Sequence, residues 1–288
     1  MANENDIQSE LSQLSAGLDA LDTRTVKRRN GIRLLLNYLA PGLGIILILL
    51  IWQSMVALKL QPDYVLPSAG QVFDALMRQA EQGILWQSTL NSLRRALQGF
   101  VLAILIATPI GIALGMNRIL RIIFRPILTG LQQLPSVAWV PAAIIWFGLS
   151  NATIYAVLLL GAVPSIANGL TAGIDQIPKQ YLKVGQVLGA NRFQTIRYIV
   201  MPASWPGYLA GLEQGWAFAW RSLMAAELIA VSPALGPGLG QMLDVGRQLG
   251  DMPLVLGSIF MIMLAGVLVE RFIFSPIRER TLRIRGLI

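Results

Sequence analysis

Long apolar runs alternate with short polar segments along most of this chain. The runs occupy residues 38–58, 96–116, 127–147, 152–174, 206–231 and 254–274. Each is about 20 residues long, which is the length that an α-helix needs to cross a bilayer core of about 30 Å. The pattern therefore predicts an all-α, polytopic membrane protein with about six transmembrane helices.

Basic residues divide the polar segments into two classes. They gather before the first run, after the second, after the fourth and in the C-terminal tail, whereas the other connections are neutral or mixed. Because basic loops stay on the cytoplasmic side, this distribution predicts a multi-pass membrane protein with both termini in the cytoplasm. Arg94 and Arg95 are the exception, since they would lie at the outer end of the second run, where they could snorkel or bind lipid headgroups.

The predicted organisation has three parts. Residues 1–33 form a cytosolic amphipathic helix and a basic collar, residues 34–275 form the six-helix domain, and residues 276–288 form a basic cytosolic tail. The N-terminal helix is either a partly ordered tail or a docking helix for a partner. It is inferred from apolar residues at steps of three and four, namely Ile7, Leu11, Leu14, Leu18 and Leu21.

Composition limits the chemistry that the chain can perform. Its 288 residues are 55% hydrophobic and 13% charged, with a formal net charge of +8, and they include no Cys and no His. Without thiolates or imidazoles we expect no enzyme, no catalytic residue and no metal site. The basic residues lie beside apolar runs rather than among aromatic residues, which favours membrane lipid over nucleic acid as their partner.

The polar segment 177–206, between the fourth and fifth runs, is too long for a simple connection. It contains two apolar stripes at helical spacing, separated by Gly189, which offers a C-terminal stop, and followed by Pro202, which would end the second stripe. The pattern predicts two short helices that meet at residues 189–191, apolar where they pack and basic where they face water. The stripes comprise Tyr181, Val184, Val187 and Leu188, then Phe193, Ile196, Val200 and Met201.

This spacing resembles the coupling loop of the permease subunits of ATP-binding-cassette importers. That loop reads Glu-Ala-Ala, three residues, Gly, nine residues, Ile-x-Leu-Pro, and residues 189, 199, 201 and 202 fall in register. Residues 183–185 replace Glu-Ala-Ala, so the usual acidic contact with the ATPase is absent. The resemblance implies a type I importer permease fold. The ATPase contacts that it implies are Lys183, Gly185, Gly189, Ala190, Asn191, Phe193, Ile199 and Pro202.

Three further stretches resemble the sulfonate, taurine and nitrate branch of that family. They are LPSVAWVP at residues 134–141, IWFG at 145–148 and AWRSLMAAELI at 219–229. The resemblance implies a homodimer of this chain, two cytosolic ATPase subunits and an extracytoplasmic binding protein, with an aliphatic sulfonate or taurine as cargo. The chain has no cofactor of its own, because no glycine-rich loop ends in Gly-Lys-Ser or Gly-Lys-Thr and a partner must therefore bind the ATP.

Two kinds of alternative remain open. Within the family the cargo could be nitrate, bicarbonate or another small solute. Outside it, a self-contained channel or secondary carrier would explain charges inside the apolar runs without any partner.

Charged and aromatic residues within the runs are the candidates for the transport path. Arg221 lies near the middle of the fifth run, and on a helical wheel it lies away from Glu213 and Glu227. We expect it either to offer its guanidinium to a passing oxyanion or to pair with a group on another helix. Glu227 is assigned to an outer gate or a binding-protein contact, and Glu213 to packing. The remaining candidates, for which packing is the alternative, are Pro135, Pro141, Trp139, Trp146 and Trp220.

Overall fold

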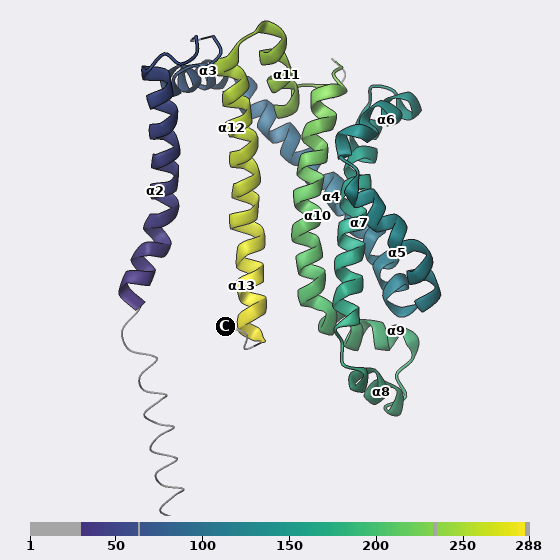
Figure 1. Ribbon diagram of the computed structural model, residues 1–288. Coiled ribbons are helices and arrows are strands. Elements are labelled where there is room, and N and C mark those ends of the chain that lie inside the picture. Colours follow the sequence, from purple (N-terminus) through teal and green to yellow (C-terminus); the bar gives the residue numbers. More distant parts are fainter. Residues whose placement is uncertain (1–29, 63, 233–234, 286–288) are drawn as a thin grey trace, which may run out of the picture. The chain divides into compact units, whose positions relative to one another are not determined.

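The computed structural model describes residues 30–62, 64–232 and 235–285, and for residues 30–41 it describes the backbone alone (Figure 1). Every element within these ranges is helical, which confirms the all-α prediction. The amphipathic helix predicted near the N-terminus lies outside the described residues. The chain divides into two units, residues 1–63 and 64–288, and each is described by itself.

The first unit contains one long helix, α2 (Asn30–Ala57), which covers the first predicted span. Its large apolar side chains from Leu43 to Ile51 are all exposed within the chain. An apolar surface of this kind is stable in lipid rather than in water, so α2 has the character of a lipid-facing span.

Two helices form the centre of the second unit. α7 (Asn151–Asp175) and α10 (Met201–Ile229) lie side by side along their lengths (Figure 1). Glycines face each other at their crossing, because a Cβ added at Gly211 would lie 2.8 Å from the Cα of Gly169. Likewise, a Cβ at Gly173 would lie 2.6 Å from the carbonyl oxygen of Ser204. Small residues thus let the two backbones approach closely, as they do in other membrane helix pairs.

A third long helix, α4 (Ile84–Met116), packs across α7. The two helices are in close contact, since a Cβ added at Gly99 would lie 2.6 Å from the Leu158 side chain. The helix begins at Ile84, twelve residues before the predicted span. That extension carries Ser92 and Arg95, which interrupt the apolar pattern and are buried in the protein.

The segment before α4 contains a short helix. α3 (Ala69–Glu81) begins at a capping box, in which the Ser68 hydroxyl accepts from the Gln71 N–H and the Gln71 side chain accepts from the Ser68 N–H. Such reciprocal bonds satisfy two donors that the first turn leaves free, and they fix where the helix starts.

The third apolar run does not form one continuous helix, as the prolines within it indicate. α5 (Arg118–Gln133) already begins in the segment predicted to be a basic loop, because the Asn117 side chain caps its first turn. It stops before Pro135, which disfavours a helical conformation in the preceding residue. A short 3₁₀ turn, η1 (Ser136–Trp139), then leads into α6 (Val140–Phe147). The chain is therefore bent within the third apolar run.

The C-terminal part continues as helix beyond the predicted sixth span. α11 (Leu239–Leu249) precedes α12 (Met252–Val269), and η4 (Glu270–Phe274) joins α12 directly to α13 (Ser275–Ile284). The segment predicted as a basic tail is thus helical as far as Ile284.

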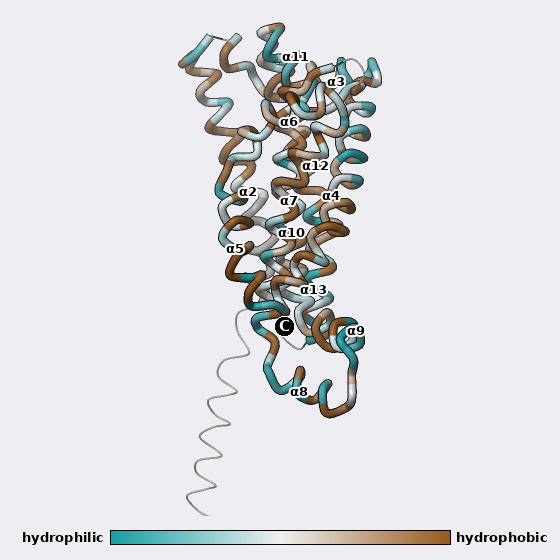
Figure 2. The backbone as a smooth tube through the Cα atoms, turned by 90° about the vertical axis from the view of Figure 1, so that its right-hand side faces the viewer, coloured by the Kyte–Doolittle hydropathy of each residue, from teal (hydrophilic) through white to brown (hydrophobic). Residues whose placement is uncertain are grey.

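Within the described ranges, three continuous helices are long and apolar enough to cross a membrane, namely Ile84–Met116, Asn151–Asp175 and Met252–Ile284. The difference from the predicted six has visible causes. The third run is broken, the described apolar part of α2 is shorter, and α10 has the length but carries three charged residues. Figure 2 shows apolar residues along the long helices of the second unit, with α8 and α9 at one end and α3 and α11 at the other. We call these the α8 end and the α11 end.

Candidate functional site

The segment between α7 and α10 forms the two short helices that its pattern predicts. α8 (Lys179–Val187) ends before Gly189, whose φ of +73° belongs to the left-handed region that favours glycine. Asn191 then caps α9 (Arg192–Gln194) through a box with Gln194, both bonds being 2.8 Å long. We call residues 179–200 the knuckle.

The second helix of the knuckle does not end at Pro202, contrary to the sequence interpretation. α9 continues through a π-helical turn, η2 (Thr195–Val200), directly into α10. Pro202 occupies the first turn of α10, where the missing N–H and the ring are tolerated because the helix before it is wound differently. Residues 192–200 of the knuckle are therefore a continuation of α10 rather than part of a separate loop.

The apolar stripe of α8 does not pack within the described part of the chain. Val187 is 87% exposed, Leu188 80% and Phe193 74%. Beside these residues lies an apolar groove of about 620 Å³, between α8 and the start of α10. Gly185 is buried against Ile199, which holds the two halves of the knuckle together. Lys183 and Asn191 are exposed, and Ala190 is half-buried.

Ion pairs join α7 to α5 at the α8 end, next to the start of the knuckle. Asp175, the last residue of α7, lies 2.5 Å from Arg121 Nη1 and 3.8 Å from Arg125 Nη1 of α5. The Arg121 guanidinium also donates to the carbonyl oxygens of Leu114 and Gly115 at the end of α4. One arginine thus joins three helix ends where α8 begins. Sequence reasoning assigned these arginines to topology and missed this role.

Arg221 lies in α10 with its side chain on the exposed surface of the unit. Its Nε donates to the Ala217 carbonyl oxygen at 3.0 Å, and its guanidinium lies 4.6 Å from the centre of the Phe218 ring. Within the described part of the chain it makes no ion pair, in agreement with the helical-wheel prediction that Glu213 and Glu227 are out of reach. Glu213 instead lies 3.2 Å from Arg278 of α13. Among the described residues, most N–H groups of the Arg221 guanidinium have no hydrogen-bond acceptor, so they can bind a group outside this chain.

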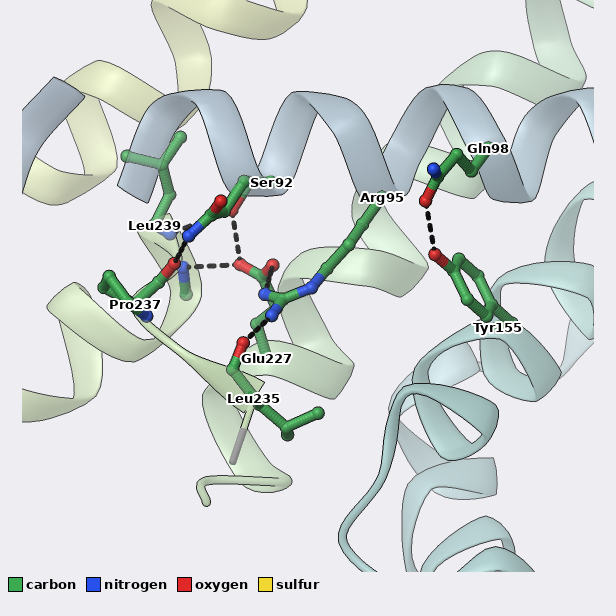
Figure 3. Close-up of polar contacts among 10 residues, drawn as sticks. Ser92, Arg95, Gln98, Tyr155, Glu227, Leu235, Pro237 and Leu239 are labelled. Carbon is green, nitrogen blue, oxygen red and sulfur yellow. Dashed lines mark hydrogen bonds and ion pairs between the residues drawn. The ribbon is translucent and has the colours of Figure 1, made fainter. Parts of the chain in front are cut away.

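Glu227 is fully buried at the α11 end of α10, among residues of α4 and the α10–α11 connection (Figure 3). Arg95 Nη1 lies 2.9 Å from Glu227 Oε1, while the Ser92 hydroxyl donates to Oε2 at 2.7 Å and the Gly240 N–H does so at 3.1 Å. The other Arg95 amino group donates to the Leu235 carbonyl oxygen. With every oxygen bonded inside the chain, Glu227 is a structural residue in this conformation and offers no surface to a binding protein.

The aromatic and proline candidates fall into separate places. Trp220 is buried, stacks on Trp216 with ring centres 6.1 Å apart and donates to the Ile262 carbonyl oxygen at 3.2 Å, so it packs the core. Trp146 is 64% exposed on α6, near the α11 end. Trp139 lies in η1 between the two helix-breaking prolines 135 and 141, and its buried indole N–H has no partner among the described residues.

A permease is the class that these observations define: apolar helices that can span a membrane, a long helix, α10, that carries an exposed arginine, and a protruding knuckle with an exposed apolar face. Among the described residues, no group of three or more His, Cys, Asp or Glu could hold a metal ion. Residues 99–274 match the family model of the binding-protein-dependent transport system inner membrane component, and the chain belongs to this family. It is thus a multi-pass transport subunit and not an enzyme.

Two relatives and one solved structure show which transport proteins the chain is similar to. It is 31% identical to the taurine transport system permease protein TauC of Escherichia coli (strain K12) over 235 residues, 80% of this chain and 84% of TauC. It is 32% identical to the riboflavin transport system permease protein RibX of Chloroflexus aurantiacus over 256 residues, 87% of this chain and 93% of RibX. These two relatives are named for chemically different cargoes, so relatedness defines the transporter class and leaves the solute open.

The fold is similar to that of a chain in the inward-facing MetNI methionine ABC transporter. The TM-score is 0.56 at 18% identity, and the similarity covers 69% of this chain and 96% of the other. The predicted fold of an ABC importer permease is therefore confirmed.

Proposed function

We propose that this chain forms the membrane path of an ABC importer for a small oxyanion, with an aliphatic sulfonate such as taurine as the first candidate. The complete transporter would contain two copies of this chain, two cytosolic ATPase subunits and an extracytoplasmic binding protein. The observation that carries the choice of cargo is Arg221 of α10, whose exposed guanidinium makes no ion pair within the described residues.

An arginine in that position needs a partner. Burying its charge in lipid costs at least about 2.5 kcal/mol, so the side chain must face protein or water. It continues an exposed stripe of small and polar residues on one face of α10, spaced by three and four residues: Ala210, Gln214, Ala217 and Arg221. A face of this composition suits a second copy of the chain or a wet path better than it suits lipid.

The free donors of Arg221 match the chemistry of an oxyanion. A guanidinium is planar and can donate two parallel hydrogen bonds to a sulfonate, carboxylate or phosphate. With Nε already bonded to Ala217, the two terminal amino groups remain for a ligand. Two copies of the chain facing each other would bring two such groups to one path, which suits a small anion in transit.

The α8 end carries the features of a coupling surface. The exposed apolar residues of the knuckle would lie against an ATPase, and the movement of that subunit on binding ATP would pass into α10 through the continuous helix. Basic residues concentrated around this end support a cytoplasmic position for it by the positive-inside rule. The N-terminus and C-terminus would lie on the same side. Lys183 is exposed where the family carries a glutamate, so we expect its contact on the ATPase to be acidic.

The test uses the transporter reconstituted in liposomes with its ATPase and binding protein. Arg221→Gln should lower binding-protein-dependent uptake of taurine by at least about tenfold, because a charged hydrogen bond is lost. Arg221→Lys should retain part of the uptake, and the complex and its basal ATPase activity should persist in both variants. Unchanged uptake in a stable Arg221→Gln complex would contradict the oxyanion path.

Two alternatives lead to different outcomes of the same experiment. RibX gives a reason to include a larger organic solute, and uptake of riboflavin but not taurine would identify that cargo class. Transport by the chain without any ATPase subunit would identify a self-contained channel or carrier instead.

A further inference from the structure

A polar crevice of about 280 Å³ opens at the α11 end, and Arg221 is not among its lining residues. Figure 3 shows Arg95, Gln98, Tyr155 and Leu235, which belong to its walls. Its walls come from two helices and from Leu235 in the α10–α11 connection. α4 contributes Asn91, Arg94, Arg95 and Gln98, and α7 contributes Asn151 and Tyr155. Neither Asp nor Glu is among these lining residues, so the crevice presents mainly hydrogen-bond donors and positive charge.

The two arginines of the crevice differ in their electrostatic state. Arg95 is neutralised by the buried carboxylate of Glu227, which is itself saturated by Ser92 and Gly240. Arg94 is exposed to the crevice, and within residues 64–232 and 235–285 it has neither an ion pair nor a side-chain hydrogen bond. The Glu227 carboxylate is thus already bonded to other groups and does not neutralise Arg94. The crevice therefore retains the positive charge of Arg94.

The amide groups around Arg94 are arranged to donate. The Tyr155 hydroxyl donates to Gln98 Oε1 at 2.7 Å, which fixes the orientation of the Gln98 amide and leaves its NH₂ group free. Asn151, the first residue of α7, makes no side-chain hydrogen bond in the described part of the chain. The uncapped start of this 25-residue helix adds partial positive charge to that of Arg94.

We propose that this crevice binds a small oxyanion group, a sulfonate, carboxylate or phosphate, between Arg94, Gln98 and Asn151. Arg94 supplies a two-pronged donor, and the two amides supply the donors that fix the ligand's orientation. The site is independent of the transport path at Arg221. A bound anion would also contact the wall formed by Leu235, whose carbonyl oxygen Arg95 holds, and would therefore stabilise the connection between α10 and α11.

The same chemistry has two sources, a free anion or the phosphate of a lipid headgroup. The experiment separates them by using the full-length chain in nanodiscs of phosphatidylcholine or of phosphatidylglycerol, with Arg221→Gln as the common background so that the transport path does not contribute. Methanesulfonate and inorganic phosphate are the soluble probes, and binding is measured by calorimetry and by the shift of the unfolding temperature. Lipid retention is measured by native mass spectrometry.

Arg94→Gln is the test variant, and Arg78→Gln is its matched control, because Arg78 is an exposed arginine of α3 that does not line the crevice. A free-anion site predicts that probe binding in phosphatidylcholine weakens at least about tenfold in Arg94→Gln and is unchanged in Arg78→Gln. A headgroup site predicts that phosphatidylglycerol is retained by the control, lost by Arg94→Gln, and competes with the soluble probes. Equal binding of both probes and of phosphatidylglycerol by the two variants would overturn the proposal.

Discussion

Arg95 on α4 and Glu227 on α10 form an ion pair of 2.9 Å in which the carboxylate side chain is fully buried and the arginine side chain is 9% exposed. Pairs of this kind give little net stability compared with apolar residues of similar size, but removal of one partner leaves an unpaired buried charge. The pair therefore holds α4 and α10 together at the α11 end, because separating them would leave a buried charge without its partner.

The first prediction concerns that ion pair. Arg95→Met should destabilise the protein by about 3–5 kcal/mol, because Glu227 then remains buried without its counter-charge. The double variant Arg95→Met with Glu227→Met should recover most of the loss. Thermal unfolding in detergent, followed by tryptophan fluorescence, measures both. Arg221→Gln is the control, since its arginine is unpaired within the described chain and should leave the unfolding temperature unchanged. A double variant no more stable than the single one would contradict the pairing.

The second prediction concerns the contact between α7 and α10. Gly211→Ala should destabilise the bundle by about 1–3 kcal/mol, because the new Cβ would lie 2.8 Å from the Gly169 backbone and the helices would have to separate. Gly130→Ala in α5 is the matched control, since nothing lies within 4 Å of the added methyl group. It should be neutral or slightly stabilising, as alanine favours helix. Equal unfolding temperatures for the two variants would show that the helices are not in close contact.

The third prediction concerns the turn of the knuckle. Gly189→Ala forces a side chain into a left-handed conformation at a cost of about 1–2 kcal/mol, and the space around it is open, so the strain is local. We expect ATP-dependent uptake to fall while the global unfolding temperature stays the same. Gly250→Ala, in the turn before α12, imposes the same backbone strain at the other end. If both variants transported equally well, the turn at Gly189 would have no special part in coupling.

The fourth prediction concerns the exposed apolar face of α8. Leu188→Asp should abolish copurification of the ATPase subunit, because a charge would replace an apolar contact at the centre of the proposed interface. The isolated chain should unfold as before, since Leu188 is 80% exposed. Leu249→Asp is the control: that side chain is 73% exposed at the α11 end and should leave the complex intact. Capture of the ATPase by the Leu188 variant at normal yield would place the interface elsewhere.

Local pattern was sufficient to predict the knuckle. The period of the apolar residues, the glycine between them and the length of the interruption are all short-range signals, and the structure has both short helices where they indicate. The same signals failed at the boundary with α10. Pro202 is tolerated there because the π-helical turn before it changes the winding, and the sequence pattern contains no sign of that turn.

Long-range pairing was not predictable in the same way. Arg95 and Glu227 are 132 residues apart, and neither residue alone indicates its partner. A weak signal existed, because the arginines at positions 94 and 95 contradicted the charge distribution that every other loop obeyed. Such an exception indicates a charge that is neutralised within the protein or by a ligand. The structure assigns the first case to Arg95.

The broken third run shows a further limit. Apolar composition predicted one span over residues 127–147, and Pro135 marked a break, but the pattern could not show that the helix would stop and restart in a new direction. The direction of the chain after this break depends on tertiary contacts of η1 with α7 and α10. A local sequence pattern contains no information about such contacts.

The chain is helical without interruption from Arg192 to Ile229, so this segment can transmit movement from one of its ends to the other. At about 1.5 Å per residue this rod is on the order of 57 Å long, with the knuckle at one end, Arg221 along its shaft and Glu227 near the other end. A tilt of about 5° applied at one end would displace the opposite end by about 5 Å, nearly one helical turn. The irregular π-helical turn is the last part of the knuckle, so a bend there would set the angle of the whole of α10. A small rotation at the α8 end is thereby amplified into a displacement large enough to strain the segment that Arg95 and Glu227 hold in place.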